Sequence, residues 1–359
     1  MSDRRKEAEE KMAKAIFISA DCWLCVFDLL SPRQLGLGIS MISHLFDYYV
    51  DEHFKTRKWT LAFIGIGSKM GENGTKEMEI VNGYGKRMPI PQIQMPRKVI
   101  RFEHILITFI DQNVIAFLRR FRPLFASFCP IDLSIGTTSD CVLELILRNI
   151  WPIIGENICG MFFFWNVFYC LRKFVPSLLN DCPSLRFHSF EFDGLFTEFP
   201  ADDSAAASDG QAVAKWLFTP LQNNVPKMLK CLLPKDDRIW SSKIEAFKTA
   251  FASASSPVNF IVVLSIPLPF TFSVMPFDQI NELTREQLAL KVISNSERFL
   301  LIRCPIARDE SKWTKWEEEA IGWRTDDPWN TIIIHIDDAR AIGDGLLNSA
   351  PGPSDQQKK

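Results

Sequence analysis

Residues 105–135 read ILITFIDQNVIAFLRRFRPLFASFCPIDLSI, and this stretch decides the fold. Its two ends, Ile105–Ile110 and Ile131–Ile135, are short apolar runs rich in isoleucine, which favours β-strands. Between them, Gln112–Phe128 repeats its apolar residues at helical spacing. The stretch therefore predicts a strand, a helix and a second strand in close succession.

The same alternation continues along the chain. Further strands are expected at Met161–Trp165 and Arg186–Phe192, and helices at Ser139–Ile154 and Val167–Asn180. The expected strands begin 25 to 30 residues apart, which is typical of stacked strand–helix repeats such as leucine-rich repeats (LRRs). An ordinary βαβ sandwich, with helices on both sheet faces, is the alternative. Either way the fold class is α/β, and the even spacing favours a degenerate LRR-like solenoid over residues 101–280.

The second half of the chain resumes the pattern after an interruption. Residues 200–212, PADDSAAASDGQA, are small and acidic and predict a flexible insert. The region 281–345 departs from the strand–helix alternation and predicts a C-terminal hairpin, helix and strand. The fold class expected for the ends of the chain is therefore α+β. Residues 346–359 predict a disordered tail. After the insert, helices are expected at Val213–Asn224 and Ser242–Ala254. Strands are expected at Met228–Leu233, Asn259–Leu264, Leu288–Ile293, Phe299–Cys304 and Thr331–Ile336.

The N-terminal part is helical in pattern. Residues 16–55 read IFISADCWLCVFDLLSPRQLGLGISMISHLFDYYVDEHFK. Asp21–Leu30 predicts one short helix, Ser31 with Pro32 starts a second, and a third begins near Ile39. The core of a unit this small rarely supplies more than ~3–5 kcal/mol of stability, so such units usually pack against a partner or a larger domain. A charged tail, 1–15, precedes this 16–58 module, and a hairpin with a proline connector, 59–100, follows it.

This N-terminal run resembles an F-box, the module that docks Skp-family adaptors in cullin-based (SCF) ubiquitin ligases. The family pattern has Leu-Pro, an acidic residue, an apolar helix ending Ile-Phe-x-x-Leu, and then Ser-Pro-x-x-Leu. The matching residues here are Asp21, Val26-Phe27-Asp28-Leu29-Leu30 and Ser31-Pro32-Arg33-Gln34-Leu35, whereas Ile18-Ser19 replaces Leu-Pro. Segments 89–118 and 298–320 are also similar to expanded F-box families of plant-parasitic nematodes.

The resemblance implies a non-catalytic subunit. It would bind a Skp-family adaptor, and through it a cullin, and would hold a target protein with its C-terminal domain, acting in the cytoplasm or the nucleus. The adaptor contacts that the resemblance implies are Ile18, Trp23, Val26, Phe27, Leu30, Pro32 and Leu35. The alternative is a protein-binding scaffold whose helices cap the solenoid and meet no adaptor. Burial of the Trp23, Phe27 and Leu30 face on the downstream domain would favour the scaffold.

Composition excludes several other classes. The 359 residues carry a net charge of −2, which leaves no electrostatic footprint for nucleic acid. Nine scattered cysteines fit a reducing compartment better than a disulfide framework. The charged N-terminus predicts no secretory signal peptide. The uncharged run Pro257–Phe277 contains three prolines near its end, so a buried strand followed by a loop is expected there instead of a membrane span.

No motif predicts chemistry, a cofactor or a metal. Cys22-x-x-Cys25 has no second pair nearby and is expected to pack within a helix. The glycine-rich segment 67–76 lacks the Gly-Lys-Ser/Thr ending of a phosphate loop, and the five histidines are dispersed. Trp313, Trp316 and Trp323 share one helix, which is expected to pack on the last sheet. Arginines 119, 120 and 122 are expected on a solvated face.

Overall fold

A computed structural model provides the structure of the chain. It describes residues 18–30, 35, 39–56, 59–61, 63–71, 76–82, 85, 87–88, 99–126, 131–190, 196–232, 237–265, 275–293, 298–323, 330–337, 339–343 and 346. The described residues up to Trp59, with Val99, form one compact unit, and the others form a second. The two units are described separately below.

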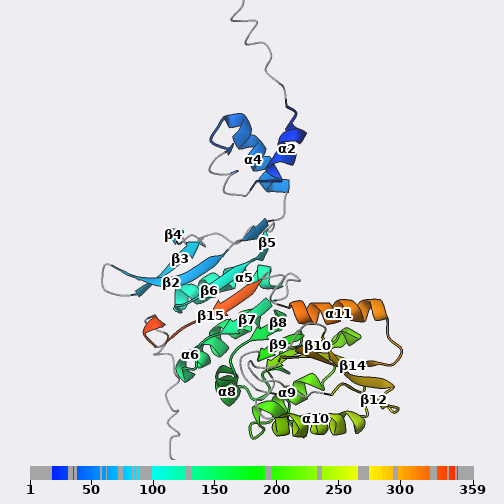
Figure 1. Ribbon diagram of the computed structural model, residues 1–359. Helices are drawn as coiled ribbons and strands as arrows, with labels where there is room; N and C mark the ends of the chain where they lie inside the picture. Colours follow the sequence, from blue (N-terminus) through cyan, green and yellow to red (C-terminus); the bar gives the residue numbers. More distant parts are fainter. Residues whose placement is uncertain are drawn as a thin grey trace, which may run out of the picture. The chain divides into compact units, whose positions relative to one another are not determined.

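The first unit is built on two helices, α2 (Ala20–Phe27) and α4 (His44–Thr56), which pack against each other (Figure 1). Ser19 caps α2 because its hydroxyl oxygen accepts a hydrogen bond from the amide of Cys22. The core consists of Phe27, Leu35 and Val50, with Trp23 set edge-on against Phe46 at 4.7 Å. The middle helix expected after Ser31 lies mostly outside the described residues.

The second unit is an α/β structure around a mixed, mostly parallel sheet. Its described strands form a 13-stranded sheet in the order β12-β13-β14-β11-β10-β9-β8-β7-β15-β6-β2-β3-β4 (Figure 1). The strands from β11 to β2 in this order are parallel to their neighbours, and both ends of the sheet are antiparallel. A separate two-stranded sheet pairs β1 (Trp59–Leu61) with β5 (Val99–Phe102).

The parallel strands lie close to their expected positions. In chain order the parallel part comprises β2 (Ile64–Met70), β6 (His104–Ile107), β7 (Ile131–Ile135), β8 (Ile158–Phe162), β9 (Phe187–Phe190), β10 (Lys227–Leu232), β11 (Phe260–Ser265) and β15 (Thr331–Ile334). From β7 to β11 the strands are neighbours in chain order, as strand–helix repeats require. The remaining strands are β3 (Lys76–Asn82), β4 (Arg87–Met88), β12 (Phe277–Asn281), β13 (Glu286–Val292) and β14 (Arg298–Pro305).

The last strand, β15, lies inside the sheet. It pairs in parallel with β6 on one side and β7 on the other, so it separates the two strands of the opening stretch. Ile332 and Ile334 are buried, and Ile333 on the opposite face is half-buried. A continuous apolar run of this kind is typical of a central parallel strand. The strand itself was predictable from sequence, but its position between β6 and β7 was not.

One layer of helices joins successive parallel strands. It contains α5 (Gln112–Ala126), α6 (Asp140–Leu145), α7 (Trp151–Ile154), α8 (Trp165–Phe174), α9 (Asp209–Leu217) and α10 (Asp237–Ala252). In this layer α5 contacts α7, and α6 contacts α8. Rings of α8, α9 and α10 meet His188 and Phe260, which the strand register places on one face of the sheet.

The opposite face of β9, β10 and β11 is covered by α11 (Glu310–Gly322). Lys230 on β10 donates from Nζ to the carbonyls of Ile321 (3.0 Å) and Trp323 (2.8 Å), at the C-terminal end of this helix. Arg186 forms a two-pronged ion pair with Glu319, both distances being 2.8 Å. Helices thus cover both faces of the sheet around β10, which is a feature of the alternative βαβ sandwich.

Two helices differ in detail from expectation. The long helix expected at 139–154 is divided by a π-helical turn, Ile146–Ile150, because Pro152 disturbs the hydrogen bonding of the preceding turn. Helix α9 begins at Asp209, within the expected insert, and Ser208 and Gln211 form a capping box at its start. The acidic composition of 200–212 thus includes the signals of a helix start.

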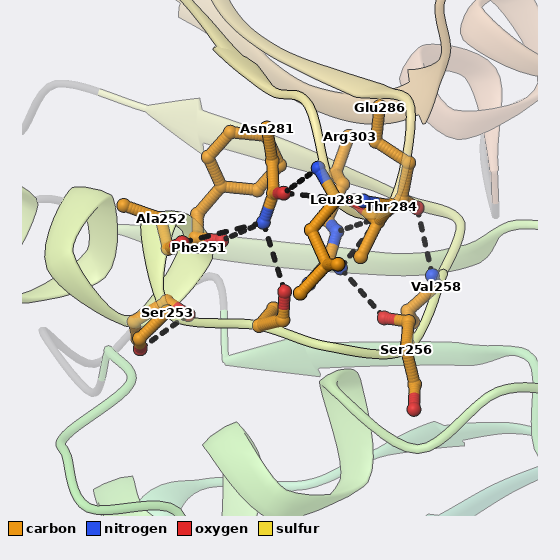
Figure 2. Close-up of polar contacts among 12 residues, drawn as sticks. Phe251, Ala252, Ser253, Ser256, Val258, Asn281, Leu283, Thr284, Glu286 and Arg303 are labelled. Atoms are coloured by element: carbon orange, nitrogen blue, oxygen red, sulfur yellow. Dashed lines mark hydrogen bonds and ion pairs between the residues drawn. The ribbon is translucent and has the colours of Figure 1, made fainter.

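A buried polar network fixes the β12–β13 turn against the end of α10 (Figure 2). The side-chain amide of Asn281 donates to the carbonyls of Phe251 and Ala254, and its oxygen accepts from the amides of Leu283 and Thr284. Beside it, the guanidinium of Arg303 pairs with Glu286 at 2.6 Å, and both side chains are inaccessible to solvent. Glu286 also accepts from the amide of Val258 (2.7 Å). The network therefore joins the end of α10 and the segment before β11 to strands β12, β13 and β14.

Candidate functional site

The structure divides the expected adaptor-binding residues into two groups. Phe27 and Leu35 have no exposed surface because they form the core of the helical unit, and Trp23 and Leu30 pack against that core. Ile18 and Val26 point outward and are exposed. Pro32 lies outside the described residues. The face of Trp23, Phe27 and Leu30 thus turns inward, toward the core of the helical unit.

The outward side of α2 is apolar as well. Five apolar or thiol residues at helical spacing are exposed there, and Asp21 in the first turn and Asp28 at the C-cap are exposed as well: the five are Ile18, Cys22, Cys25, Val26 and Leu29. Leu29 is 85% exposed, which makes it the most exposed large apolar side chain that the structure describes. We call these five residues the α2 stripe. An apolar side chain in this position gains stability only when another surface covers it.

A second exposed apolar set lies on α4 and the turn before it. Met41, Ile42, Leu45 and Tyr48 are each more than half exposed. Leu45 and Tyr48 are three residues apart and so share one side of α4. We call these four residues the α4 stripe. Together the two stripes present nine apolar or thiol side chains on a unit whose own core contains three fully buried ones.

Sequence reasoning missed Leu29 and the α4 stripe for a physical reason. Both sides of α2 are apolar, so its periodicity does not say which side faces inward. The decisive signal is the partner helix: Phe46, Val50 and His53 on α4 are buried or half-buried and meet Phe27 from one direction. Only the side of α2 that faces these residues can be core.

The expectation that Cys22 and Cys25 pack inside a helix is wrong. Both thiols are exposed and belong to the α2 stripe. Cys22 lies 3.3 Å from the hydroxyl of Ser19, which donates to its sulfur. Among the residues that the structure describes, no group of three His, Cys, Asp or Glu side chains is arranged to hold a metal ion.

The remaining sequence candidates are structural. Trp313 and Ala320 of α11 are buried in a cluster with Met228 and Ile261, and Trp316 and Trp323 pack at its margin, so this expectation is confirmed. Gly160 lets Trp323 approach the sheet, since a Cβ at this position would clash with Asp132 and the indole ring. Arg119 and Arg122 are exposed as expected, whereas Arg120 is half-buried. Residues 72–75 of the glycine-rich segment lie outside the described residues.

Two buried ionisable side chains occupy the α8–α9 side of the sheet. His188 is fully buried among aromatic rings, and burial lowers its pKa to about 4. Its Nδ1–H donates to the carbonyl of Met161 (3.0 Å). Lys227 is 4% exposed, donates to the carbonyl of Trp216, and has its pKa lowered to about 7 by burial. Among the described contacts, both side chains meet aromatic rings and backbone carbonyls.

No protein family, no curated protein and no solved structure matches this chain. In the part of the chain that the structure describes, no helix is long and apolar enough to cross a membrane.

Proposed function

We propose that this protein is a substrate receptor of an SCF-type ubiquitin ligase. The proposal depends mainly on one observation. The helical unit buries a small apolar core and also exposes two apolar stripes on its surface. An F-box has this organisation because the adaptor completes its packing. The residues that resemble the family pattern supply both parts: Phe27, Leu30 and Leu35 pack inward, and Val26 and Leu29 point outward.

In this proposal the protein performs no chemistry. Its helical unit grips a Skp-family adaptor, its α/β unit holds a target, and a separately recruited enzyme transfers ubiquitin at a raised effective concentration. Covering a side chain such as Leu29 contributes ~1.5–3 kcal/mol to binding. Association itself costs ~4–15 kcal/mol. The gain exceeds this cost only if the adaptor covers most of the exposed residues in the two stripes. Both stripes are therefore proposed as adaptor contacts.

The α/β unit is proposed as the target-binding part. Support comes from the chain-order neighbours β7 to β11 and from the single helix layer that connects them. These features are shared with LRR-like solenoids, which bind proteins on extended surfaces. The solenoid remains a proposal, because α11 also covers the second face of this region.

Co-purification tests the proposal. The tagged full chain, expressed in cells and captured, should bring down a Skp-family adaptor and a cullin, identified by mass spectrometry. Leu45→Asp should remove both, because it places a charge in the α4 stripe without touching the core of the unit. Leu283→Asp is the matched control, since Leu283 is a similarly exposed leucine on the α/β unit. Capture of neither protein by the wild-type chain would refute the ligase role.

A further inference from the structure

Cys22 and Cys25 are a pair of exposed thiols on α2. Of the eight cysteines that the structure describes, three are exposed, and the third, Cys141, lies on α6 in the α/β unit. Burial raises the pKa of Cys159 to about 11 and that of Cys182 to about 12, so these thiols stay protonated at neutral pH. Among the described cysteines, an oxidant in solution therefore meets two neighbouring thiols only on the α2 stripe.

The helix brings the two thiols within reach of a disulfide. Residues three apart in an α-helix have Cα atoms ~5 Å apart, which is inside the usual disulfide range of about 4.4–6.8 Å. Their Cβ atoms are ~5–6 Å apart, whereas a disulfide needs about 3.5–4.5 Å. The bond therefore forms when the turn between Cys22 and Cys25 tightens by about 1–2 Å.

The first turn of α2 can make this adjustment. Cys22 is the third residue of the helix, and the amides of the first turn have no partner within a helix. The hydroxyl oxygen of Ser19 accepts from the Cys22 amide at 3.4 Å, which is longer than the usual range of about 2.7–3.2 Å. The amide of Cys22 can therefore move without breaking a hydrogen bond of the helical ladder.

The hydroxyl of Ser19 also links the sulfur of Cys22 to the start of the helix. It donates to Sγ of Cys22 at 3.3 Å while it caps the Cys22 amide. Drawing the sulfur toward Cys25 takes it away from this donor and disturbs the cap. Ile18, the first residue of the α2 stripe, directly precedes the cap. Closing the disulfide therefore changes the shape of the stripe as well as its chemistry.

Two exposed carboxylates flank the pair on the same helix. Asp21 precedes Cys22 in the first turn, and Asp28 lies at the C-cap, where His53 of α4 faces it at 4.0 Å. Negative charge slows the approach of an anionic oxidant such as glutathione disulfide. Thiol and disulfide are both neutral, so a test carried to equilibrium avoids this effect on the rate.

We infer that Cys22 and Cys25 are a reversible redox pair, which a low-molecular-weight disulfide closes into an intramolecular disulfide. One cysteine thiolate attacks the oxidant and releases one reduced thiol, and the other cysteine then displaces the second. The two cysteines lose two electrons and two protons, and the oxidant gains them as two thiols. Regulation rests on the proposed function: the closed pair binds the adaptor more weakly than the open pair.

Equilibration of the full chain with glutathione buffers of rising oxidised fraction tests the pair. Free thiols are then blocked, and tryptic digestion with mass spectrometry identifies the products. We expect the peptide of residues 15–33 to lose two hydrogens and to escape blocking. Cys22→Ser and Cys25→Ser should each leave a glutathione adduct on the remaining cysteine. Cys141→Ser is the matched control, because it removes an exposed thiol outside the pair, and it should form the same disulfide as wild type.

Glutathione adducts at both cysteines without the internal bond, disulfides between two chains, or no reaction at either thiol would overturn the inference. Calorimetric titration of a Skp-family adaptor measures the regulatory effect on wild type and Cys141→Ser. Oxidation should weaken adaptor binding by about fivefold or more, and reduction with dithiothreitol should restore it. Equal affinities of the two forms would contradict the regulation. Absence of adaptor binding by the reduced chain would refute the proposed function, while the mass spectra would still decide the redox pair.

Discussion

At the scale of single residues, His188 shows how strongly the interior controls charge. It lies among Phe163, Phe168, Phe190 and Trp216, and its Nε2 has no hydrogen-bond partner among the described residues. A charged imidazole in such surroundings loses its hydration without compensation. Burial therefore keeps the histidine neutral and lowers its pKa from 6.5 to about 4.

This lowered pKa predicts acid sensitivity. Between pH 6.5 and 4 the unfolded chain binds a proton at His188 and the folded protein does not, so the free energy of unfolding falls as pH falls through this window. The loss attributable to His188 reaches about 3 kcal/mol. Urea unfolding of wild type and His188→Gln at pH 7 and pH 4.5 measures it. The variant should lose less stability on acidification, whereas the exposed control His335→Gln should behave as wild type.

An equal pH response in His188→Gln and wild type would contradict this account of His188. The comparison needs no assumption about function, because it concerns the interior of the α/β unit alone.

Spacing in the sequence did not separate the exposed residues of the candidate site from the core ones. The sequence named Ile18 and Val26, which are exposed, and also Phe27 and Leu35, which are core. Spacing identifies a helix face, but the inward face can be chosen only when the opposing helix is known. For α2 that helix is α4, and the segment between them adds Leu35 to the core.

At the scale of elements, a buried ion pair links β13 and β14. Arg303 and Glu286 are both inaccessible to solvent, and the guanidinium lies over the rings of Phe218 and Phe251. Removing one partner of such a pair leaves the other charge buried and uncompensated.

Glu286→Gln should therefore lower the free energy of unfolding by ~3–5 kcal/mol. Glu310→Gln is the control, because Glu310 pairs with Arg308 on the surface, and it should cost no more than ~1 kcal/mol. Chemical denaturation followed by circular dichroism measures both. Similar small losses in the two variants would mean that the buried pair contributes little.

Most elements could be predicted from sequence, but their arrangement could not. The apolar runs and helical spacing placed β7 at Ile131–Ile135 and β10 within a residue of its observed bounds, because burial on both faces gives a strong local pattern. The insertion of β15 between β6 and β7 depends on pairing between residues far apart in the chain, such as Thr331 with His104 and with Asp132. No local pattern encodes a pairing of that kind. The position of α11 on the opposite face has the same origin.

At the scale of the whole molecule, the chain consists of two compact units with different tasks in the proposed function. The α/β unit has a large core and its own hydrogen-bonded sheet. The helical unit has a core of three buried residues and exposes two apolar stripes. In the proposed function, the stable α/β unit would hold the target and the less stable helical unit would bind the adaptor.

This division predicts that the α/β unit folds alone. A chain lacking residues 1–58 should keep a single cooperative thermal transition and a melting temperature within a few degrees of the full protein, because the α/β unit has its own large core and hydrogen-bonded sheet. Differential scanning calorimetry measures both proteins. Loss of the transition would show that the helical unit is an integral part of the fold and would favour the scaffold alternative.

Direct titration of a purified Skp-family adaptor with the full chain tests the central claim. By isothermal titration calorimetry we predict a one-to-one complex with a dissociation constant in the micromolar range or tighter. Leu29→Asp should weaken it at least tenfold, and Leu283→Asp should leave it unchanged. Absence of binding by the folded wild-type protein, or binding that Leu29→Asp does not weaken, would contradict the account.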